Sequence, residues 1–364
     1  MLKNLQTFVS LAGLIFGSAA ADAQYSVTLL QPSGFSASEA HGISGPNQAG
    51  FGTVGGNVHA LLWSGTASSV LDLNPSGASQ SQIWGTSGSH QIGYSTQSGQ
   101  DHARLWSGTA ASAIDLNPSG FTQSHGRATS ATNQVGEGTT MFGSTHALLW
   151  SGTAASAVDL NPVGFSSSAA WATSGANQVG YGANGTGHNH ALLWSGTAAS
   201  VVDLNPTGYT ETFGAGVQGG QQVGSGYGTI TSNRNHALLW NGSASSCVDL
   251  QPSGFLYSQA WGTSGNKQTG WAWNNPSTLD FHAFLWTGTA GSGIDLHSFL
   301  PANYSTSLAF GIDSATGDIV GLAHNTTLNR DEAVMWSPVP EPSSMLILGV
   351  FALGLARKRR QTSP

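Results

Sequence analysis

The sequence is poor in charged residues and has almost no cysteine. Asp, Glu, Lys and Arg make up 7% of its 364 residues, against roughly a quarter in an average soluble protein. The single cysteine, Cys247, excludes an intramolecular disulfide and a cysteine-rich metal site. Equivalent stretches of the chain have Ala, Val or Gly at this position, so we expect Cys247 to be a small buried apolar residue.

Basic residues are the scarcest charged type. Residues 24–338 contain fifteen acidic side chains and five basic ones, a balance near −10. The five are Arg104, Arg127, Arg234, Lys267 and Arg330. Phosphate binding requires clustered Lys and Arg. We therefore expect no nucleic-acid partner.

Glycine and aromatic residues are plentiful. The chain has 50 Gly, 12 Trp and 14 Phe, and 39% of its residues are hydrophobic, which is ample material for a core. Low charge with many glycines and aromatics favours short strands joined by tight turns, in a protein that works outside the cytoplasm.

The N-terminus has the three parts of an export signal. Lys3 supplies positive charge, residues 8–20 are apolar, and Ala21-Asp22-Ala23 is a small-x-small cleavage site. We expect residues 1–23 to be a signal peptide handled by the Sec translocon and signal peptidase. The alternative is a buried N-terminal helix.

The C-terminus combines a proline-acidic motif, a short apolar run and a basic end. The motif is Val339-Pro340-Glu341-Pro342, the apolar run covers residues 345–356, and the end is Arg357-Lys358-Arg359-Arg360. The run is shorter than the roughly 20 residues of an ordinary spanning helix, and the basic cluster would remain on the cytoplasmic side.

In this order the three parts resemble the PEP-CTERM sorting signal of Gram-negative bacteria, over residues 339–364 only. The resemblance implies recognition by an exosortase and cleavage near Pro340-Glu341-Pro342. The protein would then be anchored transiently in the membrane and pass to the cell surface or the extracellular matrix.

The chain between these ends is periodic. The motif His-Ala-x-Leu-Trp begins at six histidines, spaced 43, 44, 44, 46 and 46 residues apart, and a degenerate copy begins at Glu332. Each unit has four strand candidates bounded by Gly, Pro, Asn or Ser. In one unit they are residues 170–174, 178–181, 190–194 and 201–204. Four strands in about 44 residues is the size of a β-propeller blade, and no stretch of this region is typical of a helix.

The two ends of the array complement each other. Residues 27–32 are a lone copy of the fourth strand, and the last unit stops at Trp336 without one. Pairing the first with the last would remove both open sheet edges. The sequence therefore predicts an all-β fold over residues 24–338, a seven-bladed propeller of four-stranded blades closed by the N-terminal strand.

Each motif histidine is followed 13 residues later by an aspartate. A four-residue turn such as residues 64–67 would place the two directly opposite each other on antiparallel strands. In the last copy the positions hold Glu332 and Leu29, so both partners are lost together. We expect structural hydrogen bonds, not metal ligands or catalytic bases, between His59 and Asp72, His102 and Asp115, His146 and Asp159, His190 and Asp203, His236 and Asp249, and His282 and Asp295.

These units are similar to the HAF-type extracellular repeat, and residues 282–286, His-Ala-Phe-Leu-Trp, match it best. The resemblance spans nearly the whole of residues 24–338. It implies a secreted protein and brings no known activity or ligand.

Among the first six units, length varies only between the second and third strands, and loops on a fixed scaffold often carry binding. The most notable of these loops contains Trp271, Trp273, Asn274 and Asn275, a candidate platform for sugar. The alternative is that Trp271 continues its strand and packs in the core. His188, Tyr227 and Arg234, in neighbouring loops, are weaker candidates.

The sequence contains no familiar catalytic motif. Three glutamates fall outside the repeat pattern, Glu39, Glu137 and Glu211, and nothing in the sequence brings two of them together. No run of Asp and Asn is dense enough for calcium.

We therefore expect a non-enzymatic protein with no cofactor and no metal. It would be a structural or adhesive component of the bacterial surface or biofilm matrix, in contact with exopolysaccharide or other surface proteins. The alternative is a lectin-like propeller that recognises exopolysaccharide, and a hydrolase of matrix sugar is a distant third.

Overall fold

A computed structural model describes residues 24–274, 277–278 and 280–340. Residues Tyr25–Pro338 form one compact unit. The expected signal peptide, and all of the sorting segment except Val339 and Pro340, lie outside the described residues, including Glu341, Pro342, Arg357, Lys358, Arg359 and Arg360. None of the described helices has the length and apolar character needed to cross a membrane.

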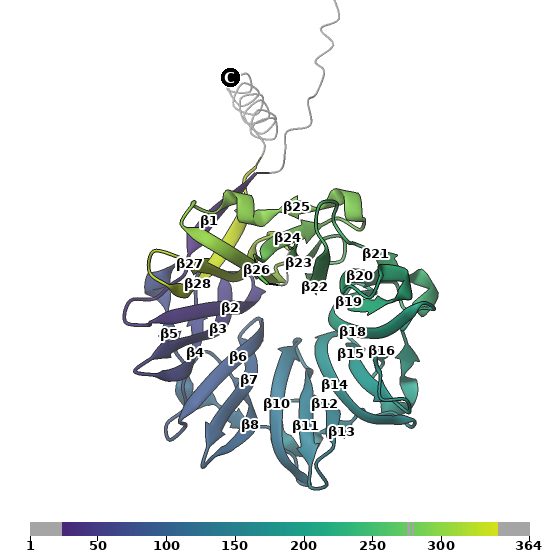
Figure 1. Cartoon of the computed structure of the whole chain (residues 1–364). Coiled ribbons are helices and arrows are strands. Elements are labelled where there is room, and N and C mark those ends of the chain that lie inside the picture. The colour runs from purple at the N-terminus through teal and green to yellow at the C-terminus, as the bar shows by residue number, and fades with distance from the viewer. Residues whose placement is uncertain (1–23, 275–276, 279, 341–364) are drawn as a thin grey trace, which may run out of the picture. The chain divides into compact units, whose positions relative to one another are not determined.

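The strands form seven four-stranded antiparallel sheets arranged as blades around a centre, which confirms the predicted propeller (Figure 1). Blade 1 consists of β2(Ala37–Ser44), β3(Asn47–Val54), β4(Asn57–Trp63) and β5(Leu71–Asp72). Blade 2 consists of β6(Gln80–Ser87), β7(His90–Gln97), β8(Gln100–Trp106) and β9(Ile114–Asp115). Blade 3 consists of β10(Phe121–Thr129), β11(Gln134–Thr140), β12(Thr145–Trp150) and β13(Val158–Asp159).

The remaining blades follow the same order. Blade 4 consists of β14(Phe165–Ser174), β15(Asn177–Asn184), β16(Asn189–Trp194) and β17(Val202–Asp203). Blade 5 consists of β18(Tyr209–Gln218), β19(Gln221–Gly228), β20(His236–Trp240) and β21(Val248–Asp249). Blade 6 consists of β22(Tyr257–Thr263), β23(Gln268–Trp273), β24(His282–Trp286) and β25(Ile294–Asp295). Blade 7 consists of β26(Tyr304–Ile312), β27(Ile319–Asn325), β28(Arg330–Pro338) and β1(Tyr25–Leu29).

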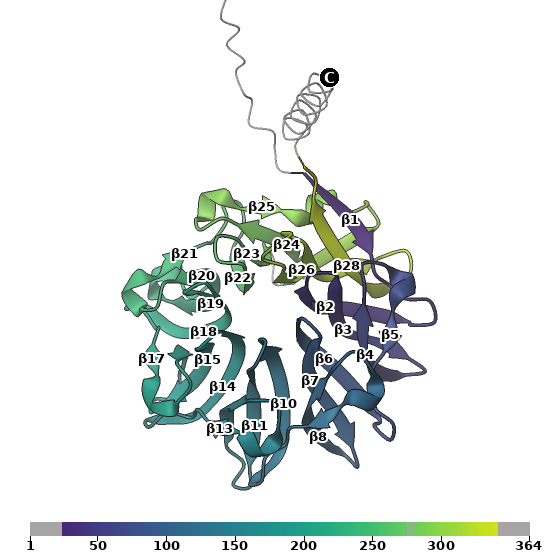
Figure 2. The same ribbon diagram turned by 180° about the vertical axis from the view of Figure 1, so that it is seen from behind.

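The N-terminal strand closes the ring, as predicted. Strand β1 pairs antiparallel with β28, with Val27 opposite Trp336 and Leu29 opposite Val334 (Figure 2). The fourth strands of the other six blades are only two residues long. A short outer strand offers little edge to another chain.

The repeated motif residues form the core. The motif tryptophans are fully buried; they are Trp63, Trp106, Trp150, Trp194, Trp240, Trp286 and Trp336. Two of them link neighbouring blades, since Trp106 and Trp336 donate through Nε1 to the carbonyls of Leu73 and Leu296 at 3.0 Å. Burying aromatic and aliphatic side chains between blades is the main stabilising contribution.

A second link recurs at every blade junction. The backbone N–H of the motif alanine donates to a hydroxyl on the first strand of the next blade, as from Ala147 to Ser168 Oγ at 3.0 Å. At the ring closure the same bond runs from Ala333 to Ser38. Each bond satisfies a buried amide that the sheet leaves unpaired.

The innermost strand of each blade contains a β-bulge. In β14, for example, the pairing with β15 shifts between Ala170 and Ala172, which leaves Trp171 unpaired. The glycine opposite the bulge is required there, because a Cβ at Gly180 would collide with the carbonyl oxygen of Ala169. A bulge redirects one side chain, and here one residue per blade faces the centre of the ring.

Candidate functional site

Seven bulge residues, one per blade, surround the centre of the propeller. In blade order they are His41, Trp84, Arg127, Trp171, Ala215, Trp261 and Phe310. All seven line a narrow central cavity of about 190 Å³. Six are large ring-bearing or guanidinium side chains, and Ala215 of blade 5 is the exception.

The large members of this ring pack against one another. The Arg127 guanidinium lies between two indoles, 5.0 Å from the Trp84 ring and 4.8 Å from the Trp171 ring. The His41 ring stacks 4.1 Å from Phe310, and Trp171 meets Trp261 edge to face at 5.2 Å. The rings of blades 4 and 6 therefore come together beside the small Ala215.

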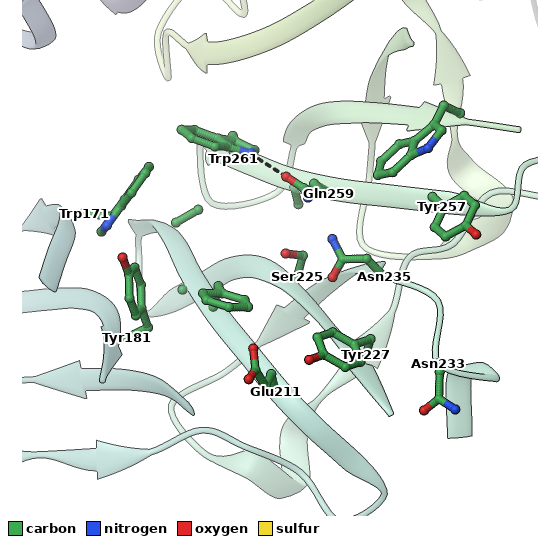
Figure 3. Close-up of a pocket in the computed structure, with 15 residues that line it drawn as sticks. Trp171, Tyr181, Glu211, Ser225, Tyr227, Asn233, Asn235, Tyr257, Gln259 and Trp261 are labelled. Atoms are coloured by element: carbon green, nitrogen blue, oxygen red, sulfur yellow. Dashed lines mark hydrogen bonds between the residues drawn. The ribbon is translucent and has the colours of Figure 1, made fainter. Parts of the chain in front are cut away.

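A larger cavity of about 660 Å³ opens beside this gap, between blades 4, 5 and 6 (Figure 3). Its floor includes Gly214 and Ala215. Seven aromatic residues line it: Trp171, Tyr181, Phe213, Tyr227, Tyr257, Trp261 and Trp273. The polar lining residues are Glu211, Ser225, Asn233, Asn235 and Gln259. At the bulge position blade 5 has a methyl group where the other blades have a large side chain, which leaves this part of the lining open.

The aromatic walls are fixed by contacts with one another. Tyr257 and Trp273 stack with their ring centres 5.0 Å apart and an angle of 14° between the rings. Tyr181 packs edge to face on Phe213 at 5.2 Å. Trp261 donates through Nε1 to Gln259 Oε1 at 3.3 Å, drawn as the dashed line in Figure 3.

The loop between β19 and β20 forms one rim of the cavity. It contains a short 3-10 turn, Thr229–Thr231, followed by Ser232 and Asn233 in the left-handed region with φ of 54° and 57°. The backbone N–H of Asn233 donates to the Gly228 carbonyl at 2.8 Å, which anchors the loop. Asn233 and Asn235 are thereby held at the mouth of the cavity.

Glu211 is the acidic residue of the described lining. Its side chain is 18% exposed, and its Oε1 lies 3.4 Å from Nδ1 of His188, which is 48% exposed. Burial and the Glu211 carboxylate both raise the pKa of the neighbouring Tyr227 phenol. Burial also raises the pKa of Tyr181. Both phenols remain hydroxyl donors at neutral pH.

The expected sugar platform is only partly at this site. Trp273 lines the cavity, whereas Trp271 is 8% exposed and packs with Phe310 and Leu322 in the core. Asn274 is exposed and is not among the described lining residues, and Asn275 lies outside the described residues. The alternative for Trp271 therefore holds. Trp271 shares a strand face with Trp273, but the rings of Trp261 and Phe310, 5.2 and 5.9 Å away, cover it.

Of the three weaker candidates for binding, only some lie at the cavity. Tyr227 lines the cavity and His188 contacts Glu211. Arg234 is exposed between Asn233 and Asn235 and is not among the described lining residues.

The three glutamates outside the repeat pattern have different partners. Glu39 Oε2 lies 3.0 Å from His41 Nε2. Glu137 is buried against Arg127, with Oε2 3.1 Å from the Arg127 Nε, and the Arg127 charge holds the pKa of this carboxyl below its usual range against the opposing effect of burial. Glu211 alone of the three lines the large cavity.

The six expected His–Asp pairs all have hydrogen-bond distances. Nδ1 lies 2.7 Å from Asp Oδ2 in five pairs and 2.8 Å in the pair of His102. The predicted register is wrong by two residues, because Leu61, and not His59, lies opposite Asp72. The connection between β4 and β5 contains a 3-10 turn, Ala67–Ser69, and is longer than the expected four residues. His59 therefore reaches Asp72 diagonally.

In blade 7 a different network replaces the pair. Asn325 Nδ2 donates to Glu332 Oε2 at 3.3 Å, and Arg330 Nε donates to Glu332 Oε1 at 2.7 Å. Within the part of the chain that the structure describes, no three His, Cys, Asp or Glu side chains are grouped to hold a metal ion.

Sequence reasoning missed Trp171, Tyr181, Tyr257 and Trp261 as lining residues. A signal was present at the bulge position, which follows the Asp position of the preceding unit by 12 residues in six of the seven blades while its side chain changes from blade to blade. In a repeat array, such a variable position on a constant scaffold is a place to expect binding.

Comparison with known proteins identifies similar folds but does not assign the chain to a family. No family model and no curated protein matches the chain. The propeller domain of the Trilobed protease from Pyrococcus furiosus is similar with a TM-score of 0.55 and 10% identity, over 86% of this chain and 98% of that one. That domain has an open velcro topology, whereas β1 closes the ring here.

Two further similar structures are enzymes. An oligogalacturonate lyase in complex with manganese has a TM-score of 0.52 and 9% identity, over 88% of this chain and 97% of that one. Puromycin hydrolase has a TM-score of 0.54 and 9% identity, over 81% of this chain and about half, 53%, of that one. These likenesses overturn the expectation of a non-enzymatic protein, because the same propeller occurs in lyases and hydrolases. At such identities they establish for this chain its seven-bladed β-propeller fold.

Proposed function

We propose that the protein is an exported carbohydrate-binding propeller, and that the cavity between blades 4, 5 and 6 is its binding site. The observation that carries the proposal is the lining itself, in which seven aromatic side chains, three of them tyrosines, surround a cavity whose other polar side chains are a carboxylate, three amides and a serine hydroxyl.

The aromatic rings suit the apolar faces of sugars. A pyranose presents C–H groups on its ring faces, which stack on flat aromatic side chains. The stacked pair Tyr257 and Trp273 and the Trp261 ring are held by neighbours, so binding would order few side chains. Such preorganisation reduces the entropic cost of association.

The polar residues suit sugar hydroxyls. Amide side chains such as Asn235 and Gln259 both donate and accept, and the Tyr227 hydroxyl and the Glu211 carboxylate add a donor and an acceptor. A cavity of about 660 Å³ lies within the roughly 300–1,000 Å³ of small-molecule sites. One similar structure is named as an oligogalacturonate lyase, so a saccharide ligand is compatible with a propeller of this size.

The terminal segments support a location outside the cell. A signal peptide over residues 1–23 and a sorting segment from Val339 would deliver the propeller to the surface or matrix, where polysaccharide is abundant. Replacing Pro340-Glu341-Pro342 by alanines should leave precursor in the membrane fraction. Normal release of that variant would reject the sorting assignment.

Binding is tested with a glycan array followed by calorimetry on the best ligand. Tyr227→Ala and Trp273→Ala should each weaken binding about tenfold, or by about 1.4 kcal/mol, because each removes an aromatic face from the lining. The matched control is Phe142→Ala, because Phe142 is also aromatic but is 93% exposed on the β11–β12 loop of blade 3. Absence of binding to every glycan, including the host's own polysaccharide, would reject the proposal.

A further inference from the structure

The charge of the large cavity is set by one residue. Among its described lining residues Glu211 is acidic and none is Lys or Arg. Glu211 lies on β18 opposite Tyr227 of β19, and both side chains are seen at the cavity in Figure 3. A ligand in the cavity therefore meets a carboxylate beside aromatic rings.

Glu211 is partly buried, and no arginine balances its negative charge as arginines balance those of the buried Glu137 and Glu332. Glu137 is paired with Arg127, and Glu332 lies 2.6 Å from Arg330 Nη2. Among the described residues no Lys or Arg is paired with Glu211, whose neighbour at 3.4 Å is the half-exposed imidazole of His188. The field of the carboxylate thus acts on whatever enters the cavity.

A partly buried charge discriminates between ligand charges more strongly than an exposed one. Two opposite charges attract each other more strongly at the effective dielectric constant near a protein surface than in bulk water. A ligand ammonium would gain this attraction and would also be attracted to the faces of Tyr227 and Trp273. A ligand carboxylate would be repelled by Glu211 and disfavoured by the same ring faces.

We infer that the cavity selects sugars by charge, preferring amino sugars with a free ammonium group to neutral sugars, and neutral sugars to uronic acids. This inference rests on the proposed carbohydrate-binding function. The expected preference differs from the one that the name of the similar oligogalacturonate lyase implies, because oligogalacturonate is an acidic sugar.

One exposed residue opposes this order. Arg234 stands between the lining residues Asn233 and Asn235 at the rim. If its long side chain reached a bound ligand, it would favour a carboxylate. The test therefore includes this residue.

The experiment compares three probes of equal length by calorimetry, namely oligomers of glucosamine, glucose and galacturonate, at a pH at which the amine is protonated. The wild-type protein should bind the glucosamine oligomer at least about tenfold more tightly than the glucose oligomer, and the galacturonate oligomer most weakly. In Glu211→Gln the ratio of glucosamine to glucose affinity should fall to about one. Arg234→Gln should leave the order of the three probes unchanged.

The outcomes separate the inference from the proposal beneath it. Binding of sugars in an order that Glu211→Gln does not change would overturn the charge selection and leave carbohydrate binding in place. If the galacturonate oligomer bound most tightly and this preference were lost in Arg234→Gln, the inference would also be overturned. Charge selection would then be assigned to Arg234 at the rim. No binding of any sugar would reject the proposed function itself. Circular dichroism melting of both variants confirms that the ratios come from folded protein.

Discussion

The backbone N–H of Ala333 donates a 3.1 Å hydrogen bond to Ser38 Oγ, although the two residues are 295 positions apart. Ser38 in turn donates to Gln31 Oε1 at 2.6 Å. The hydroxyl thus joins blade 7, blade 1 and the segment that follows the closing strand.

Ser38→Ala should destabilise the propeller by about 1–3 kcal/mol, the cost of a buried amide without a partner. Urea unfolding measures this change. Ser36→Ala is the matched control, because Ser36 is exposed two residues earlier and its loss should change stability by no more than about 0.5 kcal/mol. Equal stability of both variants would show that the bond across the closure contributes nothing.

The repeated His–Asp pairs should contribute modestly, and the aspartate more than the histidine. The side chains of His146 and Asp159 are 22% and 46% exposed, so water competes for their bond. Asp159 also accepts from the backbone N–H of Asn161 at 2.8 Å through its other oxygen. His146→Ala should cost about 1 kcal/mol or less, and Asp159→Ala should cost more, because it removes both bonds. The reverse order in urea unfolding would contradict this account.

His125 should make stability depend on pH. Its Nε2 lies 3.2 Å from Asp101 Oδ2 and its Nδ1 lies 3.4 Å from Glu137 Oε1. Burial and the Arg127 charge lower the pKa of His125. The hydrogen bonds to Glu137 and Asp101 and the negative charge of Glu137 outweigh these two effects, so the pKa of His125 is raised above its usual value. A raised folded-state pKa stabilises the fold fully below the unfolded-state value of about 6.5, and this contribution disappears as the pH rises through the folded-state pKa.

The measurement is the unfolding free energy of the wild type minus that of His125→Asn at several pH values. The difference should be largest in mildly acidic buffer and shrink toward alkaline pH. An NMR titration should give a His125 pKa above about 6.5. A difference that grows with pH would show that burial dominates instead.

Filling the gap in the bulge ring should block the large cavity. Ala215→Phe places in blade 5 the residue that blade 7 has at the same position, Phe310. Sugar binding should weaken at least about tenfold. Because the space is open, the stability cost should stay below the roughly 1–3 kcal/mol of overpacking a closed core. Ala215→Ser, which keeps the small size, should retain binding in the same calorimetric assay, and unchanged binding in Ala215→Phe would place the ligand elsewhere.

The architecture was predictable because it rests on short-range, repeated signals. The motif His-Ala-x-Leu-Trp and the turns around it indicated the blades, and each of these signals acts within one unit of some 44 residues. The lone first strand and the missing fourth strand of the last unit indicated closure by residues near Val27, because pairing the two ends removes both open sheet edges.

The His–Asp register shows where such reasoning begins to fail. The 13-residue spacing is correct, but the turn before Leu71 takes a 3-10 form that moves Asp72 opposite Leu61. A shift of two residues keeps both side chains on the same face of the sheet. The spacing therefore indicated the pair without giving its geometry.

By itself the sequence determined the period, the number of blades and the strand that closes the ring, because these follow from local pattern and chain order. Only the tertiary structure decided the site. The bulges turn one side chain per blade toward the centre, and the packing of Trp171 against Trp261 beside Ala215 brings residues of three blades around one cavity. Such a cavity depends on the sizes of side chains that meet from distant parts of the chain, and no spacing within a single repeat encodes it.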